Sequence, residues 1–250
     1  MKIGIIITAK NCVDYTKKCI ESIVTEIDSV LILVDDFSTD GTKAYFKSLS
    51  DDLDNVIVLT DLDTFSLAEK WNLGVDAARG DKCDAFLICN NDIIFNKHTI
   101  DRLAQRMMEA YMNNETVGMV TAHNIRDAIS PDEILDYPFV QNATESPGPD
   151  FSCFLLSDDA YTDVGVFDED YMPCFFEDND YHMRMIQAGW RAISFTGAPY
   201  YHYGSITQNS VPGGICAGDQ FRRNRAYFKA KFGFIPGDRK YDVVVKSLEK

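Results

Sequence analysis

Short apolar runs alternate with amphipathic segments over the first 95 residues, and this alternation constrains the fold most strongly. The apolar runs have the length of buried strands, and the segments between them carry apolar residues at helical spacing. We expect strands at residues 3–7, 30–34, 56–60 and 85–89, and helices at 15–24, 42–49 and 67–78. This order predicts an α/β fold with a Rossmann-like, mostly parallel central sheet flanked by helices.

The second half of the chain is expected to extend this sheet. Apolar periodicity and glycine stops indicate further elements there. We expect helices at 99–112, 180–188 and 218–232 and strands at 117–120, 151–156 and 192–195. Residues 124–149 contain four of the eight prolines and are expected to form a long loop, of the kind that is often functional.

These elements predict one domain over residues 1–250. Within it we expect a nucleotide-binding half at about 1–95, a second half at about 96–235, and a C-terminal tail at 236–250.

Charge, cysteine content and missing motifs argue against several classes of protein. A formal net charge of −15 disfavours nonspecific binding to nucleic acid, because the average surface repels a polyanion. Seven cysteines without a C-x-x-C pair argue against a disulfide framework and a zinc ribbon. Neither G-x-G-x-x-G nor G-x-x-x-x-G-K-[ST] is present, which disfavours dinucleotide oxidoreductases and P-loop ATPases. Without a transmembrane run or a signal peptide, we expect a cytoplasmic protein.

Polar residues follow two of the expected strands. Asp35 and Asp36 come directly after the second strand, and Asn90, Asn91 and Asp92 follow the fourth. Ligands of open α/β sheets bind beyond the carboxyl ends of the strands. A carboxylate there can accept from a base or a ribose, and one carboxylate with two amides suits a divalent cation that also holds phosphate. Capping and ordinary turn formation remain alternatives for these residues.

A second group of acids lies where the helix expected at 180–188 begins. Glu177, Asp178 and Asp180 could simply stabilise the amino end of that helix through its dipole. The adjacent Phe175 and Phe176 imply a partly desolvated setting, which would raise a carboxylate pKa towards that of a general base.

Two further candidate site residues are a histidine and an arginine. His202 stands among tyrosines just past a strand and is either a metal ligand or a structural histidine. Arg222 belongs to a basic cluster on the helix expected at 218–232. That cluster could close over a pyrophosphate, or it could be a solvated face.

Several segments in order resemble the inverting family 2 glycosyltransferases with the GT-A fold, particularly their rhamnosyl- and galactofuranosyltransferase relatives. The resemblance covers most of the chain, from Ile3 to about Gly233. It is carried by residues 34–42 (VDDFSTDGT), 72–80 (NLGVDAARG), 90–92 (NND), 164–169 (VGVFDE), 177–184 (EDNDYHMR), 188–190 (AGW), 202–205 (HYGS) and 224–233 (NRAYFKAKFG).

The resemblance implies a role for each candidate residue. Asp92 would bind Mn²⁺ or Mg²⁺, and His202 would complete the metal site. Asp178 would be the general base that deprotonates the acceptor hydroxyl, while Glu177 and Asp180 would position the acceptor or the base. The residues expected to bind the donor are Thr8, Asn11, Asp35, Asp36, Asn72, Asn90, Asn91 and Arg222.

The resemblance also implies that residues 96–235 form a metal and acceptor half, with a smaller subregion on the acceptor side. It further implies the substrates. The donor would be a UDP- or dTDP-linked sugar and the acceptor a hydroxyl of a glycan or glycolipid, with peripheral contact to a membrane left open. One departure is Asn90, which replaces the first Asp of the family's Asp-x-Asp motif and contributes less charge to a metal.

Two other functions stay open: a catalytically silent nucleotide-sugar-binding module, and a sugar-1-phosphate nucleotidylyltransferase. The latter would need a Gly-rich loop after the first strand, where this chain has TAKNC at 8–12.

Overall fold

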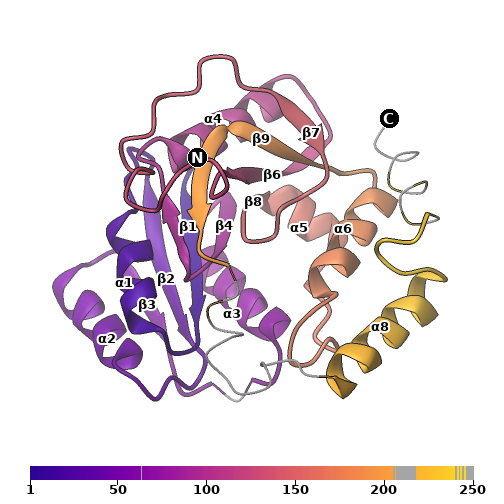
Figure 1. Cartoon of the computed structure of the whole chain (residues 1–250), viewed down its shortest axis with the longest axis horizontal. Coiled ribbons are helices and arrows are strands. Elements are labelled where there is room, and N and C mark those ends of the chain that lie inside the picture. Colours follow the sequence, from indigo (N-terminus) through magenta and orange to yellow (C-terminus); the bar gives the residue numbers. More distant parts are fainter. Residues whose placement is uncertain are drawn as a thin grey trace.

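The computed structural model describes residues 1–62, 64–204, 206, 218–239, 241, 243 and 245. Within these residues, one nine-stranded sheet forms the centre of the molecule, and helices lie on both of its faces (Figure 1). The strands are β1 (Ile3–Ala9), β2 (Ser29–Asp35), β3 (Val56–Leu59), β4 (Ala85–Asn90), β5 (Ile93–Phe95), β6 (Val117–Asn124), β7 (Glu145–Pro147), β8 (Cys153–Ser157) and β9 (Arg191–His202).

The two faces of the sheet are covered by different helices. Along β1, Ile5 and Ile7 pack into the cluster that includes α1, α2 and α4, while Ile6 packs into the cluster that includes α3, α5 and α6. This follows from the strand period, because successive side chains point to opposite faces. The described helices are α1 (Val13–Glu21), α2 (Thr42–Asp52), α3 (Leu67–Gly80), α4 (Thr99–Met112), α5 (Asp158–Val164), α6 (Glu177–Gln187) and α8 (Asp219–Phe232).

The strand order is β3-β2-β1-β4-β8-β6-β9-β5, with β7 paired to β9. The first four strands are parallel, β8 is antiparallel to both of its neighbours, and β9 is again parallel to β6. The carboxyl ends of β1, β2 and β4 therefore meet at one edge. There Thr8 pairs with Asn90, and Ala9 pairs with Asp35.

Glycines allow α3 to approach β1 closely. A Cβ atom on Gly74 would lie 2.5 Å from Cγ2 of Ile6, and one on Gly4 would lie 2.5 Å from Cβ of Ala78. Real side chains do not come so close, so a larger residue at either position would push the helix away from the sheet. This contact fixes the helix that supplies one wall of the functional site.

Every strand and helix expected from the sequence is present, and most ends shift by a few residues. The exception is β9, which continues to His202, seven residues beyond its expected end at 195, so that His202 ends this strand and does not follow it. Among the elements given above, three short ones were not expected, namely β5, β7 and α5. The segment 124–149 is thus not wholly a loop, because β7 pairs with β9 there. Residues 205 and 207–217, which lie between β9 and α8, are outside the described part, as is most of the tail at 236–250.

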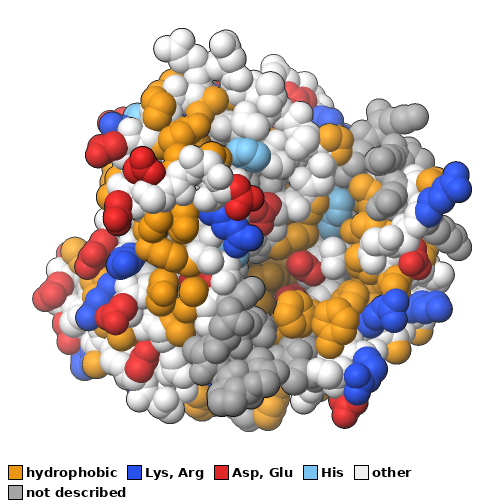
Figure 2. All heavy atoms as spheres, in the orientation of Figure 1, with side chains coloured by type: hydrophobic (Ala, Val, Ile, Leu, Met, Phe, Trp, Pro, Cys, Tyr) orange, Lys and Arg blue, Asp and Glu red, His pale blue; other side chains and the backbone are white. Residues whose placement is uncertain are grey.

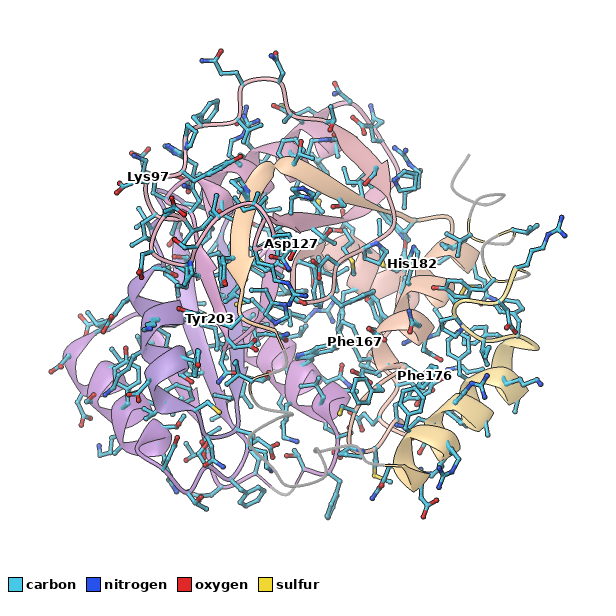
Figure 3. All side chains as sticks on the ribbon, in the orientation of Figure 1. Lys97, Asp127, Phe167, Phe176, His182 and Tyr203 are labelled. Carbon is cyan, nitrogen blue, oxygen red and sulfur yellow. The ribbon has the colours of Figure 1, made fainter. Side chains whose placement is uncertain are left out.

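A third apolar cluster holds α8 against the segment that leads into α6. Phe176 packs against Phe228 of α8, with ring centroids 5.9 Å apart. The buried members of this cluster are Tyr171, Phe176, Met183, Phe228 and Phe234. Figure 3 shows Phe176 at the beginning of α6, close to α8. This cluster therefore packs the start of α6 against α8.

Candidate active site

A cleft of about 960 Å³ opens at the edge where the parallel strands end. Figure 2 shows it as a hollow with acidic and histidine side chains inside and at its border. Its walls come from the ends of β1 and β4, the start of α3, residues 148–152 and the start of α6. The expected site residues that line it are Thr8, Asp36, Asn90, Asn91, Asp92, Glu177, Asp178 and His202.

Asp36 is held between two lysines at one end of the cleft. Its carboxylate lies 3.2 Å from Nζ of Lys70 on α3 and 3.3 Å from Nζ of Lys10, which follows β1. Lys70 is only 4% exposed, and its ammonium also donates to the carbonyl of Ser66 at 3.0 Å. Asp36 and the two lysines together carry one net positive charge. This acidic chain therefore presents a cationic patch inside the cleft.

Both lysines line the cleft and were missed as site residues in the sequence. Lys10 carried a usable signal, because it stands directly after the first strand. No sequence signal marked Lys70, because its ammonium reaches the cleft only through the packing of α3 beside β1 and β2.

Asp92 and His202 meet because β5 pairs with β9. In this ladder Ile93 lies opposite His202, and the backbone N–H of Tyr203 donates to the Asp92 carbonyl at 3.0 Å. The carboxylate oxygen Oδ1 of Asp92 is then 3.0 Å from Nε2 of His202. Its second oxygen, Oδ2, accepts from the N–H of Ile206 at 3.1 Å.

The chemistry of this pair fits a divalent cation that is also bound by a ligand. A carboxylate oxygen and an imidazole nitrogen suit Mn²⁺, and a carboxylate suits Mg²⁺. Among the described residues, no group of three or more His, Cys, Asp or Glu side chains could hold a metal by itself. Asp92 and His202 would therefore need further oxygen ligands from a substrate, as diphosphates supply.

Glu177 and Asp178 stand side by side at the start of α6. Glu177 is 4% exposed and Asp178 is half-buried, and both line the cleft. Burial raises the pKa of Asp178, and the N–H of Asn179, which donates to Oδ1 at 2.6 Å, acts in the opposite direction. Burial, reinforced by the Asp178 charge, raises the pKa of Glu177 well above its ordinary value. Asp178 is thus a carboxylate whose basicity is increased by its surroundings.

His182 is a further cleft residue that was not singled out in the sequence. It lies one helical turn after Asp178 on α6, is 3% exposed, and lines the same cleft. Figure 3 shows it further along the helix than Phe176. Its position four residues after Asp178 was the available signal, because that spacing places two side chains on one face of a helix.

Asn11 and Asn72, both expected to bind the donor, do not line the cleft. The side-chain oxygen of Asn11 accepts from the N–H of Thr39 at 2.7 Å and so joins the ends of β1 and β2. Asn72 is 5% exposed, and its side chain links α3 to the segment before α6 by hydrogen bonds. It accepts from the Phe167 N–H at 2.9 Å and donates to the Phe167 carbonyl at 2.9 Å and to Glu169 at 2.8 Å.

Asp35 and Arg222 also lie outside the cleft lining. Asp35 is 2% exposed, and both of its oxygens lie 3.4 Å from the N–H of Ser38, in a turn-forming role. Arg222 is on the exposed side of α8, where it pairs with Asp219. Within the described part of the chain, the lysine and arginine side chains that line the cleft are those of Lys10 and Lys70.

Asp180, expected to be catalytic, is fully buried and does not line the cleft. Its two oxygens lie 2.6 Å from Nε of Arg184 and 2.6 Å from Nζ of Lys231, and it accepts from the Tyr171 hydroxyl at 3.1 Å. These contacts join α6 to α8 and to the preceding segment. Its surroundings favour a structural role.

Comparisons with known proteins agree with this architecture. The model of the family "Glycosyl transferase family 2" matches residues 4–160, which is more than half of the chain. A galactofuranosyl glycosyltransferase of Leishmania donovani is 35% identical over 82 residues. That match covers 32% of this chain and 18% of the length of the relative.

Solved structures share the fold at low sequence identity. TarS of S. aureus superposes with a TM-score of 0.64 at 16% identity, and the match covers 99% of this chain and 43% of TarS. The mannosyltransferase PcManGT from Pyrobaculum calidifontis, solved with GDP-Man and Mn²⁺, superposes with a TM-score of 0.62 at 14% identity. That match covers 99% of this chain and 68% of PcManGT. The chain has the GT-A fold and belongs to glycosyl transferase family 2.

Proposed function

We propose that this protein transfers a sugar, with inversion, from a nucleoside diphosphate sugar to a hydroxyl group of a glycan or glycolipid. The observation that carries this proposal is that Asp178 and the Asp92–His202 pair line one cleft at the carboxyl edge of the sheet. A base for the incoming hydroxyl and a binding site for the leaving diphosphate are thus available in one place. Family membership supports the same reaction.

The donor would lie along the edge of the sheet. Asp36 would accept from the base or the ribose, with Thr8 and Asn90 beside it at the ends of β1 and β4. Lys10 and Lys70 hold that carboxylate in place and add positive charge for the diphosphate. The solved relatives support a nucleotide-sugar donor, because their structures contain GDP-Man in PcManGT and UDP-GlcNAc in TarS. We propose UDP or dTDP as the nucleotide.

Asp92 and His202 would hold Mn²⁺ or Mg²⁺, with Asn90 and Asn91 nearby in the cleft. When bound, the cation would neutralise the charge of the leaving diphosphate. The presence of Mn²⁺ in PcManGT supports a divalent cation.

Asp178 would take the proton of the acceptor hydroxyl. The acceptor oxygen then forms a bond to the anomeric carbon while the bond from that carbon to the diphosphate oxygen breaks. The electron pair leaves with the nucleoside diphosphate, and the proton stays on Asp178. A single displacement of this kind inverts the anomeric carbon and requires no nucleophile from the protein. The raised pKa of the half-buried Asp178 carboxyl suits a general base.

The described helices include none that is both long and apolar enough to cross a bilayer. Six described cysteines carry free thiols, which supports a reducing compartment, and we propose the cytoplasm.

The test is the variant Asp178→Asn, which keeps the shape of the side chain and removes its basicity. Binding of the donor, measured by calorimetry, should stay within about threefold, while transfer falls by about 10²–10⁴-fold. If donor affinity fell as far as transfer, Asp178 would be a donor ligand and the assignment of the base would be wrong.

A further inference from the structure

Two buried acids on α6 have opposite surroundings. Asp180 is fully buried and its charge is compensated by Arg184 and Lys231, each 2.6 Å away. Glu177 is 4% exposed, yet none of the ion pairs among the described residues includes it. Its Oε2 atom is buried and has no hydrogen-bond partner within that part of the chain. Ionisation of Glu177 therefore costs more free energy than ionisation of Asp180.

The neighbour of Glu177 makes ionisation still less favourable. Asp178 follows it directly, and its charge raises the pKa of Glu177 beyond the effect of burial. The backbone N–H groups of Phe175 and Glu177 oppose this only in part. The charge of His182 lowers the pKa of Asp178, whereas no cation is among the groups that lower the pKa of Glu177. When two adjacent carboxyl groups differ in this way, one of them retains its proton. Glu177 is the more deeply buried of the two, so the proton stays there.

A neutral Glu177 is also a hydrogen-bond donor. A buried O–H group without an acceptor is unfavourable, and it gains stability when an acceptor reaches it. Glu177 lines the cleft, and rotation about the terminal bond of its side chain can exchange the positions of its two oxygens. When a sugar substrate occupies the cleft, one of its hydroxyl oxygens can supply this hydrogen-bond acceptor.

We propose that Glu177 is a neutral carboxylic acid that donates a hydrogen bond to a sugar hydroxyl in the cleft, leaving Asp178 as the only ionised acid of the pair. This rests on the proposed function. It makes Glu177 a positioning residue, whereas Asp178 alone takes a proton from the acceptor. The donor and the acceptor present the same hydroxyl chemistry, and the second test below distinguishes them as the source of the sugar.

The first test is infrared difference spectroscopy of the whole chain near neutral pH. The carbonyl stretching band of a protonated carboxyl group should be present in the wild type and in Asp178→Asn, and absent in Glu177→Gln. Absence of the band from the wild type would overturn the proposal. This readout needs no substrate and does not depend on transfer.

The second test compares ligands that differ only by a sugar. UDP-GlcNAc against UDP, and GDP-Man against GDP, are titrated with Mn²⁺ while the band is recorded. A shift of the band with the sugar nucleotide alone identifies the donor sugar as the partner. A shift that requires an added acceptor glycan identifies the acceptor. A band that no sugar-bearing ligand shifts would overturn the donor role of the O–H group.

The third test uses substitutions at Glu177. Glu177→Ala should weaken the sugar-dependent affinity about tenfold, equivalent to about 1.4 kcal/mol. Glu177→Gln, which keeps a neutral N–H donor, should recover most of that loss. If Gln were as damaging as Ala, a carboxylate charge would be needed and the proposal would be wrong. If no nucleotide bound at all, the proposed function would fail, while the infrared band would still report the state of Glu177.

Discussion

Replacing Asp180 by Asn should destabilise the protein strongly without touching the cleft. The substitution keeps the shape of a fully buried side chain and removes the carboxylate that pairs with Arg184 and Lys231. Lys231 keeps a second partner, Asp168, at 2.6 Å, whereas Arg184 loses its carboxylate partner. Breaking a buried ion pair from one side costs about 3–5 kcal/mol. The lower end applies here, because Arg184 is 20% and Lys231 is 30% exposed, so water can reach both cations. A loss of about 3 kcal/mol corresponds to a fall in Tm of roughly 6–12 °C for a chain of this length.

The assay is thermal unfolding followed by circular dichroism, together with nucleotide titration below the transition. Asp159→Asn, at an exposed acid on α5, is the matched control and should shift Tm by less than about 2 °C. The affinity for nucleotide should be unchanged in the folded Asp180→Asn protein. An unchanged Tm with transfer abolished would refute the structural assignment and restore the catalytic role suggested by the sequence.

Three further predictions follow from the packing and charges. Lys70→Met should weaken binding of a nucleoside diphosphate about tenfold by calorimetry, because it removes a buried cation from the cleft; unchanged affinity would mean that Lys70 only supports the fold. Gly74→Val should lower the free energy of unfolding by about 1–3 kcal/mol, because its side chain would clash with Ile6, whereas Gly80→Ala, with open space around it, should not. Burial raises the pKa of Glu177 in the folded state. The free energy of unfolding should therefore fall as pH rises above about 4.3, the ordinary pKa of Glu. Glu177→Gln should therefore become more stable relative to wild type as pH rises; a difference that is independent of pH would contradict the shift.

The strands and helices could be predicted because local patterns encode them. Runs such as 85–89 are apolar on both faces, as a strand covered by helices on both sides requires. The short strand β5 could not be predicted, because three residues give no period and its pairing with β9 depends on distant residues. Yet that pairing is what brings Asp92 to His202.

The cleft could be located from the sequence only in part. Polar residues at strand ends, such as Asp36 and Asp92, line it as the carboxyl-edge rule predicts. The roles of Asp178 and Asp180 could not be distinguished in this way. Both lie in one helical turn, and they differ by their tertiary neighbours. Lys231, which binds Asp180, lies 51 residues further along the chain in α8. A motif therefore identified the right segment but could not assign a role to each of its residues.

Metal-dependent nucleotide binding tests the central claim most directly. UDP and dTDP are titrated into the protein by calorimetry, once with Mn²⁺ and once with EDTA, and the series is repeated with Asp92→Asn. We predict that one nucleotide binds with Mn²⁺, that EDTA weakens binding, and that Asp92→Asn loses most of the metal effect. Equal binding with Mn²⁺ and EDTA, or no binding of either nucleotide, would contradict the proposed donor site.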